Sequence, residues 1–159
     1  MRLPTLPAFP SHPLAAKGVN AFTQGHVAIF RATGGKIGSH VPGGGPMLLL
    51  NHVGAKSGKR RTTPLQYFPD GEDIVLIASK GGARKNPGWY HNLKANPVTT
   101  VELKGEQRRV QVHEASPPER AELWPKIVEM YDDYAVYQTR TDREIPVLVL
   151  KRTTGAAKT

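Results

Sequence analysis

The stretch VTTVELKGEQRRVQVHE, residues 98–114, contains two strand-like runs separated by the turn-forming tripeptide KGE at 104–106. In the second run, Val110 and Val112 alternate with polar residues. Alternation with a period of two is typical of a strand that has one face in the core and the other in water. Two such runs joined by a glycine-containing turn predict a β-hairpin.

Similar runs elsewhere extend this hairpin into a sheet. The tripeptide PDG at 69–71 supplies a second turn, and the run DIVLIAS at 73–79 is almost wholly apolar, which predicts a central, buried strand. Strands joined by hairpins, with few helices, favour a small antiparallel barrel over a parallel doubly wound sheet. The expected strands lie near 46–53, 61–68, 73–79, 98–104, 107–114 and 145–151.

Three helices are expected around this sheet. Apolar residues recur at helical spacing from about Pro13 to the TGG at 33–35, which predicts an amphipathic helix. A second helix should have Asn86 as its N-cap and Pro87 in its first turn. A third should begin at Ser116, where the sequence has the pattern of a capping box.

Length and composition indicate one domain of 159 residues. Residues 1–12 are rich in proline and should form an irregular arm, residues 13–152 the barrel domain, and residues 153–159 a disordered tail. Because no 18-residue apolar run and no secretion signal is found, we expect a soluble protein of the cytoplasm. Alternatively, the helix at 13–31 also makes a peripheral contact with the inner face of the cell membrane.

The composition excludes several chemistries. There is no cysteine, so disulfides and thiolate chemistry are absent, and the six histidines form no H-E-x-x-H or H-x-H pair, so we expect no metal. The segment GAKSGK is one residue too short for a nucleotide phosphate loop. The formal net charge of +9 favours an anionic partner without naming it.

Two glycine-containing turns collect cations. The first is GAKSGKRRTTP at 54–64, and the second is ASKGGARKNPGWYHN at 78–92, which leads from a buried strand into a helix. A helix N-terminus suits an anion because its free N–H groups and its dipole both favour negative charge. Either turn alone is equally well explained as a solvated surface turn. Together they hold Lys56, Lys59, Arg60, Arg61, Lys80, Arg84 and Lys85.

Three of the five tyrosines, Tyr131, Tyr134 and Tyr137, recur at every third position. On a helix this spacing gives one aromatic stripe with hydroxyl groups at its edge. The stripe is interpreted either as part of the core or as an aromatic wall beside a planar ligand.

The two turns and the tyrosine segment resemble the deazaflavin-dependent nitroreductases over roughly residues 13–152. The resemblance implies an α+β fold, namely an FMN-binding-like split β-barrel of mostly antiparallel strands with an N-terminal helix and two or three flanking helices. It also implies coenzyme F420, a deazaflavin with a phosphate and an oligoglutamate tail, and hydride transfer from reduced F420 to a quinone, nitroaromatic or related acceptor. Gly88 stands where the family has a bulkier residue, which implies a different choice of acceptor.

The resemblance also implies roles for individual residues. Ser79 and Tyr134 are the expected catalytic residues, which hydrogen-bond the acceptor and supply a proton. Tyr131, Tyr134 and Tyr137 are the expected substrate-binding residues. The expected cofactor-binding residues are Lys56, Ser57, Gly58, Arg61, Thr63, Pro64, Ser79, Lys80, Gly81, Gly88, Trp89, Tyr90 and Asn92.

Three alternatives remain open at this stage. A split barrel with the same loops accommodates FMN, because a phosphate-binding turn does not distinguish the two cofactors. A non-catalytic carrier of F420 or lipid would bind the cofactor without turnover. A nucleic-acid-binding module is favoured only by the charge, since the tyrosines are not interleaved with basic residues on exposed strands, and we expect no nucleic-acid partner. The sequence leaves the oligomeric state open.

Overall fold

The computed structural model describes residues 13–33 and 45–153, with the backbone alone for 13–22. The predicted arm at 1–12 and residues 154–159 of the predicted tail lie outside the described residues. The strands are β1 (Met47–Val53), β2 (Arg60–Gln66), β3 (Phe68–Asp70), β4 (Asp73–Ile77), β5 (Val98–Leu103), β6 (Glu106–Glu114) and β7 (Val147–Arg152). The helices are α1 (Pro13–Ala32), the 3-10 helix η1 (Lys80–Gly82), α2 (Gly88–Ala95), α3 (Pro117–Met130) and α4 (Asp133–Thr139).

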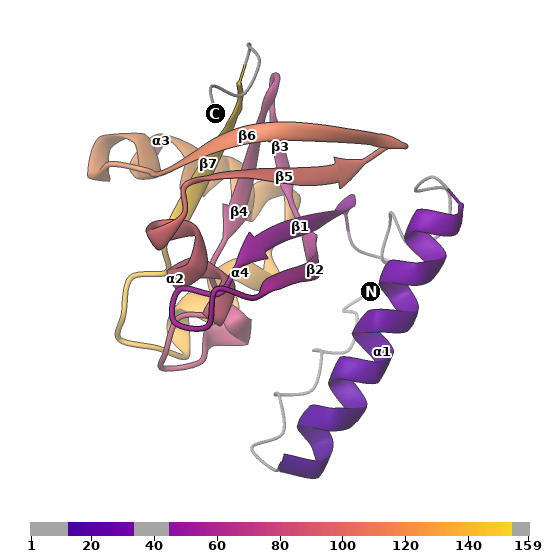
Figure 1. The fold of residues 1–159 in the computed structure, drawn as a ribbon. Helices are drawn as coiled ribbons and strands as arrows, with labels where there is room; N and C mark the ends of the chain where they lie inside the picture. Colours follow the sequence, from indigo (N-terminus) through magenta and orange to yellow (C-terminus); the bar gives the residue numbers. More distant parts are fainter. Residues whose placement is uncertain (1–12, 34–44, 154–159) are drawn as a thin grey trace.

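The strands form one antiparallel sheet in the order β2-β1-β5-β6-β7-β4-β3. β2 and β3 are the two edges of this order, yet only Tyr67 separates them in the chain. A flat sheet of seven strands, spaced about 4.8 Å apart, would hold its edges roughly 29 Å apart, which one residue cannot span. The sheet therefore curls into the half-barrel of Figure 1. The predicted antiparallel barrel is confirmed.

The hairpin predicted from KGE forms between β5 and β6. Leu103 pairs with Glu106, which leaves Lys104 and Gly105 as a two-residue loop. Both loop residues have positive φ, 51° and 72°. A type I′ turn requires this geometry, and it matches the twist of the two strands.

The strand predicted over 61–68 is divided in the structure. β2 ends before Tyr67, whose side chain enters the barrel core with 4% of its surface exposed, and β3 starts after it. The turn predicted at 69–71 falls later, because Pro69 belongs to β3 and the chain turns at Gly71, where φ is 60°. Proline is tolerated there since β3 is an edge strand, where a missing N–H donor need not interrupt a ladder.

β4 is buried on both faces, as its apolar sequence predicts. Ile74 and Leu76 join the cluster inside the barrel, whereas Val75 and Ile77 join a second cluster outside it. This outer cluster includes side chains from α3 and α4. The two helices thereby lie against one wall of the barrel, which places α4 beside the end of β4.

The two predicted helix starts have different outcomes. Ser116 caps α3, and its hydroxyl accepts a hydrogen bond from the Glu119 N–H at 3.4 Å. Asn86 does not cap α2, which begins at Gly88 with Pro87 before it. The Asn86 carboxamide oxygen instead accepts a hydrogen bond from Arg143 at 2.7 Å. A tertiary contact has replaced the local cap.

α1 lies beside the β1–β2 edge of the barrel (Figure 1). Its Arg31 guanidinium donates to both carboxylate oxygens of Glu102, at 3.1 and 2.9 Å, and to the Thr62 hydroxyl at 3.3 Å. No helix of the described residues is long and apolar enough to cross a membrane. The peripheral membrane contact predicted for residues 13–31 falls partly on side chains outside the described residues and stays a prediction.

A candidate cofactor and acceptor cavity

An open cavity of about 1600 Å³ lies between α1, β2, η1, α2 and α4. Pockets for single drug-sized ligands typically measure about 300–1,000 Å³, so this one has room for a large cofactor together with a second ligand. Among the described residues that line it, none is acidic. The basic lining residues are Arg31, Lys59, Arg60, Arg61, Lys80 and Arg140.

The first predicted anion turn lies at the edge of this cavity. Of its residues, Lys59 and Arg61 line the cavity, whereas Lys56, Ser57 and Gly58 do not. Two backbone hydrogen bonds close the turn. The Gly58 N–H donates to the Gly54 carbonyl oxygen at 2.9 Å, and at the base of the turn the Gly54 N–H donates to the Lys59 carbonyl oxygen at 2.8 Å. The cations at 60 and 61 belong to β2 and those at 56 and 59 to the turn, so the basic residues of this stretch lie both in the cavity lining and outside it.

The second predicted turn is held in place by Arg143. The guanidinium group donates to the carbonyl oxygens of Ala78, Ser79 and Ala83 at 3.2, 2.8 and 2.9 Å, and to Asn86 Oδ1 at 2.7 Å. These bonds hold the segment from the end of β4 to the start of α2. Sequence reasoning missed Arg143, because nothing local distinguishes it from the chain's other arginines.

The same turn packs closely on α4. Lys80, Gly81 and Gly82 all have positive φ, 47°, 64° and 83°. A Cβ built on Gly82 would lie 2.5 Å from the Tyr137 carbonyl oxygen. Glycine is therefore required there, and the close approach places Lys80 near the tyrosine side of the cavity.

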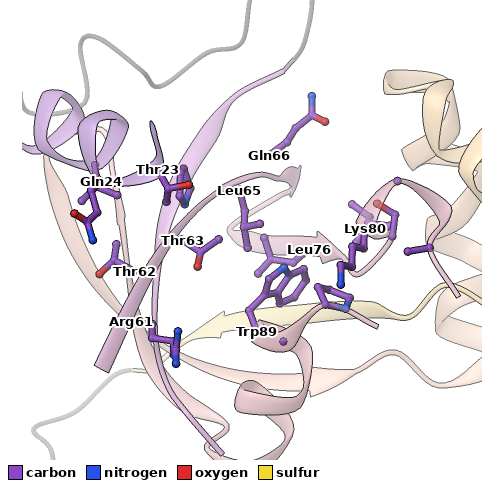
Figure 2. Close-up of a pocket in the computed structure, with 18 of the residues that line it drawn as sticks. Thr23, Gln24, Arg61, Thr62, Thr63, Leu65, Gln66, Leu76, Lys80 and Trp89 are labelled. Atoms are coloured by element: carbon purple, nitrogen blue, oxygen red, sulfur yellow. The ribbon is translucent and has the colours of Figure 1, made fainter. Parts of the chain in front are cut away.

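The floor of the cavity is apolar. Figure 2 shows Leu65, Leu76 and Trp89 gathered between Thr63 and Lys80. Apolar side chains of this kind suit one face of a planar ring system.

Of three further predicted residues, two line the cavity and one does not. Pro64 and Gly88 line the cavity, and a Cβ added to Gly88 would meet nothing within 4 Å. Tyr90 points elsewhere, because its hydroxyl is 3.1 Å from each carboxylate oxygen of Glu114.

A polar network lies behind the cavity wall. Thr63 lines the cavity, and its hydroxyl is 2.9 Å from His52 Nε2. His52 Nδ1 is in turn 2.9 Å from Asn92 Nδ2, and Asn92 Oδ1 accepts from the Ala55 N–H at 2.9 Å. The predicted site residue Asn92 therefore contacts the base of the first turn and a histidine, and does not itself line the cavity.

Burial holds His52 neutral. Only 5% of its surface is exposed, and this burial, with a further contribution from the positive charge of Arg61, lowers its pKa to about 4. A histidine with a depressed folded-state pKa stabilises the fold fully above its unfolded pKa of about 6.5. That stability is lost as the pH falls toward 4, because the unfolded chain then binds a proton that the folded chain excludes.

The tyrosines do not form one helical stripe. Tyr131 follows α3, and its hydroxyl donates to the Tyr67 carbonyl oxygen at 2.9 Å, outside the cavity lining. Tyr134 and Tyr137 lie on α4 and do line the cavity. The rings of Tyr131 and Tyr134, and those of Tyr134 and Tyr137, meet edge to face with centroids 5.9 and 5.8 Å apart. The core interpretation is confirmed for the buried Tyr131 and Tyr134, whereas a ligand-facing role for Tyr134 and Tyr137, which line the cavity, stays a prediction.

Tyr134 and Ser79 are positioned for different kinds of contact. Burial raises the pKa of Tyr134, so its hydroxyl remains protonated, and it donates to Gln66 Oε1 at a long 3.3 Å. Ser79 is 7% exposed, and no hydrogen bond of its hydroxyl is found among the described residues. Its position in the lining leaves that hydroxyl available to a ligand.

Comparison with known proteins identifies the family. Residues 22–152 match the family described as F420H(2)-dependent quinone reductase. The chain belongs to this family. An F420H(2)-dependent quinone reductase of Mycobacterium tuberculosis is 45% identical over 130 residues, which cover 80% of this chain and 87% of that protein. This confirms the predicted oxidoreductase class and F420 as its cofactor.

Two solved structures agree with the family assignment. An F420-H2-dependent reductase is 41% identical, with a TM-score of 0.62, covering 70% of this chain and 98% of its own. A second structure, described as a domain-swapped dimer, is 36% identical, with a TM-score of 0.64, covering 84% of this chain and 99% of its own. The split β-barrel expected for an F420H(2)-dependent quinone reductase is therefore confirmed.

Proposed function

We propose that this chain transfers a hydride from reduced F420 to a quinone bound in the same cavity. The observation that carries the proposal is the division of the lining, which among the described residues has six basic and no acidic side chains around an apolar floor, with only Arg31 of the six in an ion pair, to Glu102. A phosphate followed by several glutamates needs positive side chains distributed along its length, and a planar ring needs a flat apolar surface to pack against. The same division supports F420 over FMN, whose single phosphate requires fewer cations.

The basic residues then bind the acidic part of the cofactor. Arg60 and Arg61 of β2 and Lys80 of η1 lie in the lining itself. Lys56, with the backbone of Ser57 and Gly58, lies outside the lining and would extend this field along the glutamate tail. The ring would rest on Trp89 and Leu65, since these side chains form the floor (Figure 2).

When bound, reduced F420 supplies the hydride. The chain's task is to hold the acceptor against it and to stabilise the charge that develops on the acceptor oxygen. Tyr134 remains a protonated donor at neutral pH because burial raises its pKa. Ser79 offers a second hydroxyl from the end of β4, and Tyr137 continues the wall. Tyr134 and Ser79 are therefore the proposed proton donors.

The reaction tests the proposal directly. Purified protein mixed with reduced F420 and a short-chain quinone should oxidise the cofactor. The reaction is measured by the return of the visible absorbance of oxidised F420. A nitroaromatic compound assayed in parallel tests the acceptor that the sequence also predicts. Binding of F420 with no oxidation by any quinone would instead support a non-catalytic carrier.

The position of the cations predicts unequal effects in a matched pair of variants. Arg61→Ala should weaken F420 binding by roughly 1–3 kcal/mol, the range for charge-assisted hydrogen bonds. Lys56→Ala should cost less than about 1 kcal/mol, because Lys56 lies outside the lining and acts through solvent. Fluorescence titration at two salt concentrations measures both, and added salt should weaken wild-type binding. If both variants bound F420 as tightly as the wild type, the turn at 54–64 would be only a solvated surface turn.

A further inference from the structure

Four groups form a continuous hydrogen-bonded chain from the first basic turn to the cavity. They are the Ala55 N–H, the Asn92 carboxamide, the His52 ring and the Thr63 hydroxyl, and each successive pair is 2.9 Å apart. The family resemblance assigned no role to His52. Because His52 is buried and its partners are fixed, the directions of these hydrogen bonds can be deduced.

The backbone N–H of Ala55 fixes the orientation of the Asn92 carboxamide. A peptide N–H can only donate, so the Asn92 atom facing Ala55 must be its oxygen. The Asn92 amino group therefore faces His52 Nδ1 and donates to it, which requires Nδ1 to carry no proton. A neutral imidazole must then carry its proton on Nε2 and donate it to Thr63 Oγ1.

Neutrality of the ring is supported independently of this geometry. Burial and the charge of Arg61 both lower the pKa of His52, to about 4. A protonated ring would also place an N–H at Nδ1 against the amino group of Asn92, so that two donors would face each other. Both arguments favour the single tautomer with the proton on Nε2.

The Thr63 hydroxyl thereby keeps its own proton free to donate to a partner other than His52. Its oxygen accepts from His52, and no other hydrogen bond of this hydroxyl is found among the described residues. Thr63 lines the cavity, between Arg61 at the basic side and Leu65 at the apolar floor. The remaining O–H is thus available to a ligand in the cavity.

We propose that Thr63 donates a hydrogen bond to an acceptor atom of the bound cofactor, and that His52 and Asn92 are positioning residues that fix its direction. This rests on the proposed function, and it adds a specificity element to it. Because His52 is itself the donor, the Thr63 O–H is free for a ligand that presents an oxygen or an unprotonated nitrogen at this point, and such a ligand is favoured. Asn92 also fixes the base of the first basic turn, so one residue positions both parts of the site.

Binding measurements on two Thr63 variants test the donor role. Thr63→Val removes the hydroxyl at nearly constant volume and should raise the Kd for oxidised F420 roughly five- to tenfold, as expected for one neutral hydrogen bond. Thr63→Ser keeps the hydroxyl and should restore affinity close to that of the wild type. The same titrations with the deazaflavin that carries only its ribityl chain, without phosphate and glutamates, locate the acceptor atom. A loss shared by both ligands places it on the ring or the ribityl chain, and a loss confined to F420 places it on the phosphate side.

The positioning role needs a readout that a structural role would not move. Nitrogen-15 spectra of the wild type at neutral pH should show His52 protonated at Nε2 alone. His52→Phe should lose about as much F420 affinity as Thr63→Val, and the double variant should lose little more, because both remove the same directed donor. A melting temperature for each variant separates this coupling from unfolding.

Three results would overturn the inference. One is a proton on Nδ1 of His52, and another is additive loss in the double variant. The third is wild-type affinity in Thr63→Val while the wild type binds F420, an outcome that leaves the proposed function standing. Failure of the wild type to bind F420 at all would overturn the proposed function together with it.

Discussion

Replacing Arg143 with leucine should lower the free energy of unfolding by roughly 2–4 kcal/mol, since buried carbonyl groups lose charged donors. It should also weaken F420 binding at least tenfold. The four hydrogen bonds of this guanidinium hold the segment that carries Ser79, Lys80 and Gly81 into the cavity. Denaturant unfolding and F420 titration measure the two effects.

Two further variants sharpen this prediction. Arg143→Lys keeps the charge but cannot reproduce the planar fork of donors, so it should remain well below the wild type in affinity. Arg152→Ala is the matched control, because Arg152, the last residue of β7, is exposed and pairs with Glu106 of β6 at 2.9 Å. It should change stability by less than about 1 kcal/mol. Unchanged stability and affinity in Arg143→Leu would contradict the positioning role.

Tyr134→Phe should lower the turnover of a quinone by roughly ten- to a hundredfold, the lower range for one acid–base contribution. The ring and its edge-to-face contacts remain, so the melting temperature and the F420 affinity should stay near those of the wild type. Steady-state oxidation of reduced F420 measures turnover. Ser79→Ala should act in the same direction, and the two should combine less than additively if they share one path for the proton.

Tyr131→Phe is the matched control for this experiment. In the wild type, the Tyr131 hydroxyl donates a hydrogen bond to the Tyr67 carbonyl oxygen, and Tyr131 lies outside the cavity lining. Losing it should cost about 1–3 kcal/mol of stability, because a buried acceptor is left without its donor, while turnover is unaffected. If Tyr131→Phe slowed turnover as much as Tyr134→Phe, the tyrosines would act through packing and not through a hydroxyl at the acceptor.

The parts of the fold that depend on local patterns could be predicted from the sequence. Alternation in 107–114 and the KGE turn specify the β5–β6 hairpin, because twist and side-chain period are local properties. The division between β2 and β3 could not be predicted. Tyr67 sits where the barrel closes, and this closure depends on the whole sheet order, which no window of sequence contains.

The same distinction holds within the candidate site. Ser79, Lys80 and Arg61 could be predicted because glycine turns and clustered charges are visible in sequence. Arg143 and His52 could not, because their roles arise from partners 57–65 and 11–40 residues away in the chain. The Tyr131–Tyr137 segment was predicted as a group but not divided, since the helix break after Met130 decides which tyrosines reach the cavity.

Titration of the purified protein with oxidised F420 and, separately, with FMN tests the central claim most directly. In the part of the chain that the structure describes, six basic side chains line one cavity, and the five besides the Glu102-paired Arg31 are more than a single phosphate needs. F420 should therefore bind at least about tenfold more tightly than FMN, the equivalent of one additional charge-assisted hydrogen bond. FMN binding as tight as that of F420, or tighter, would contradict it.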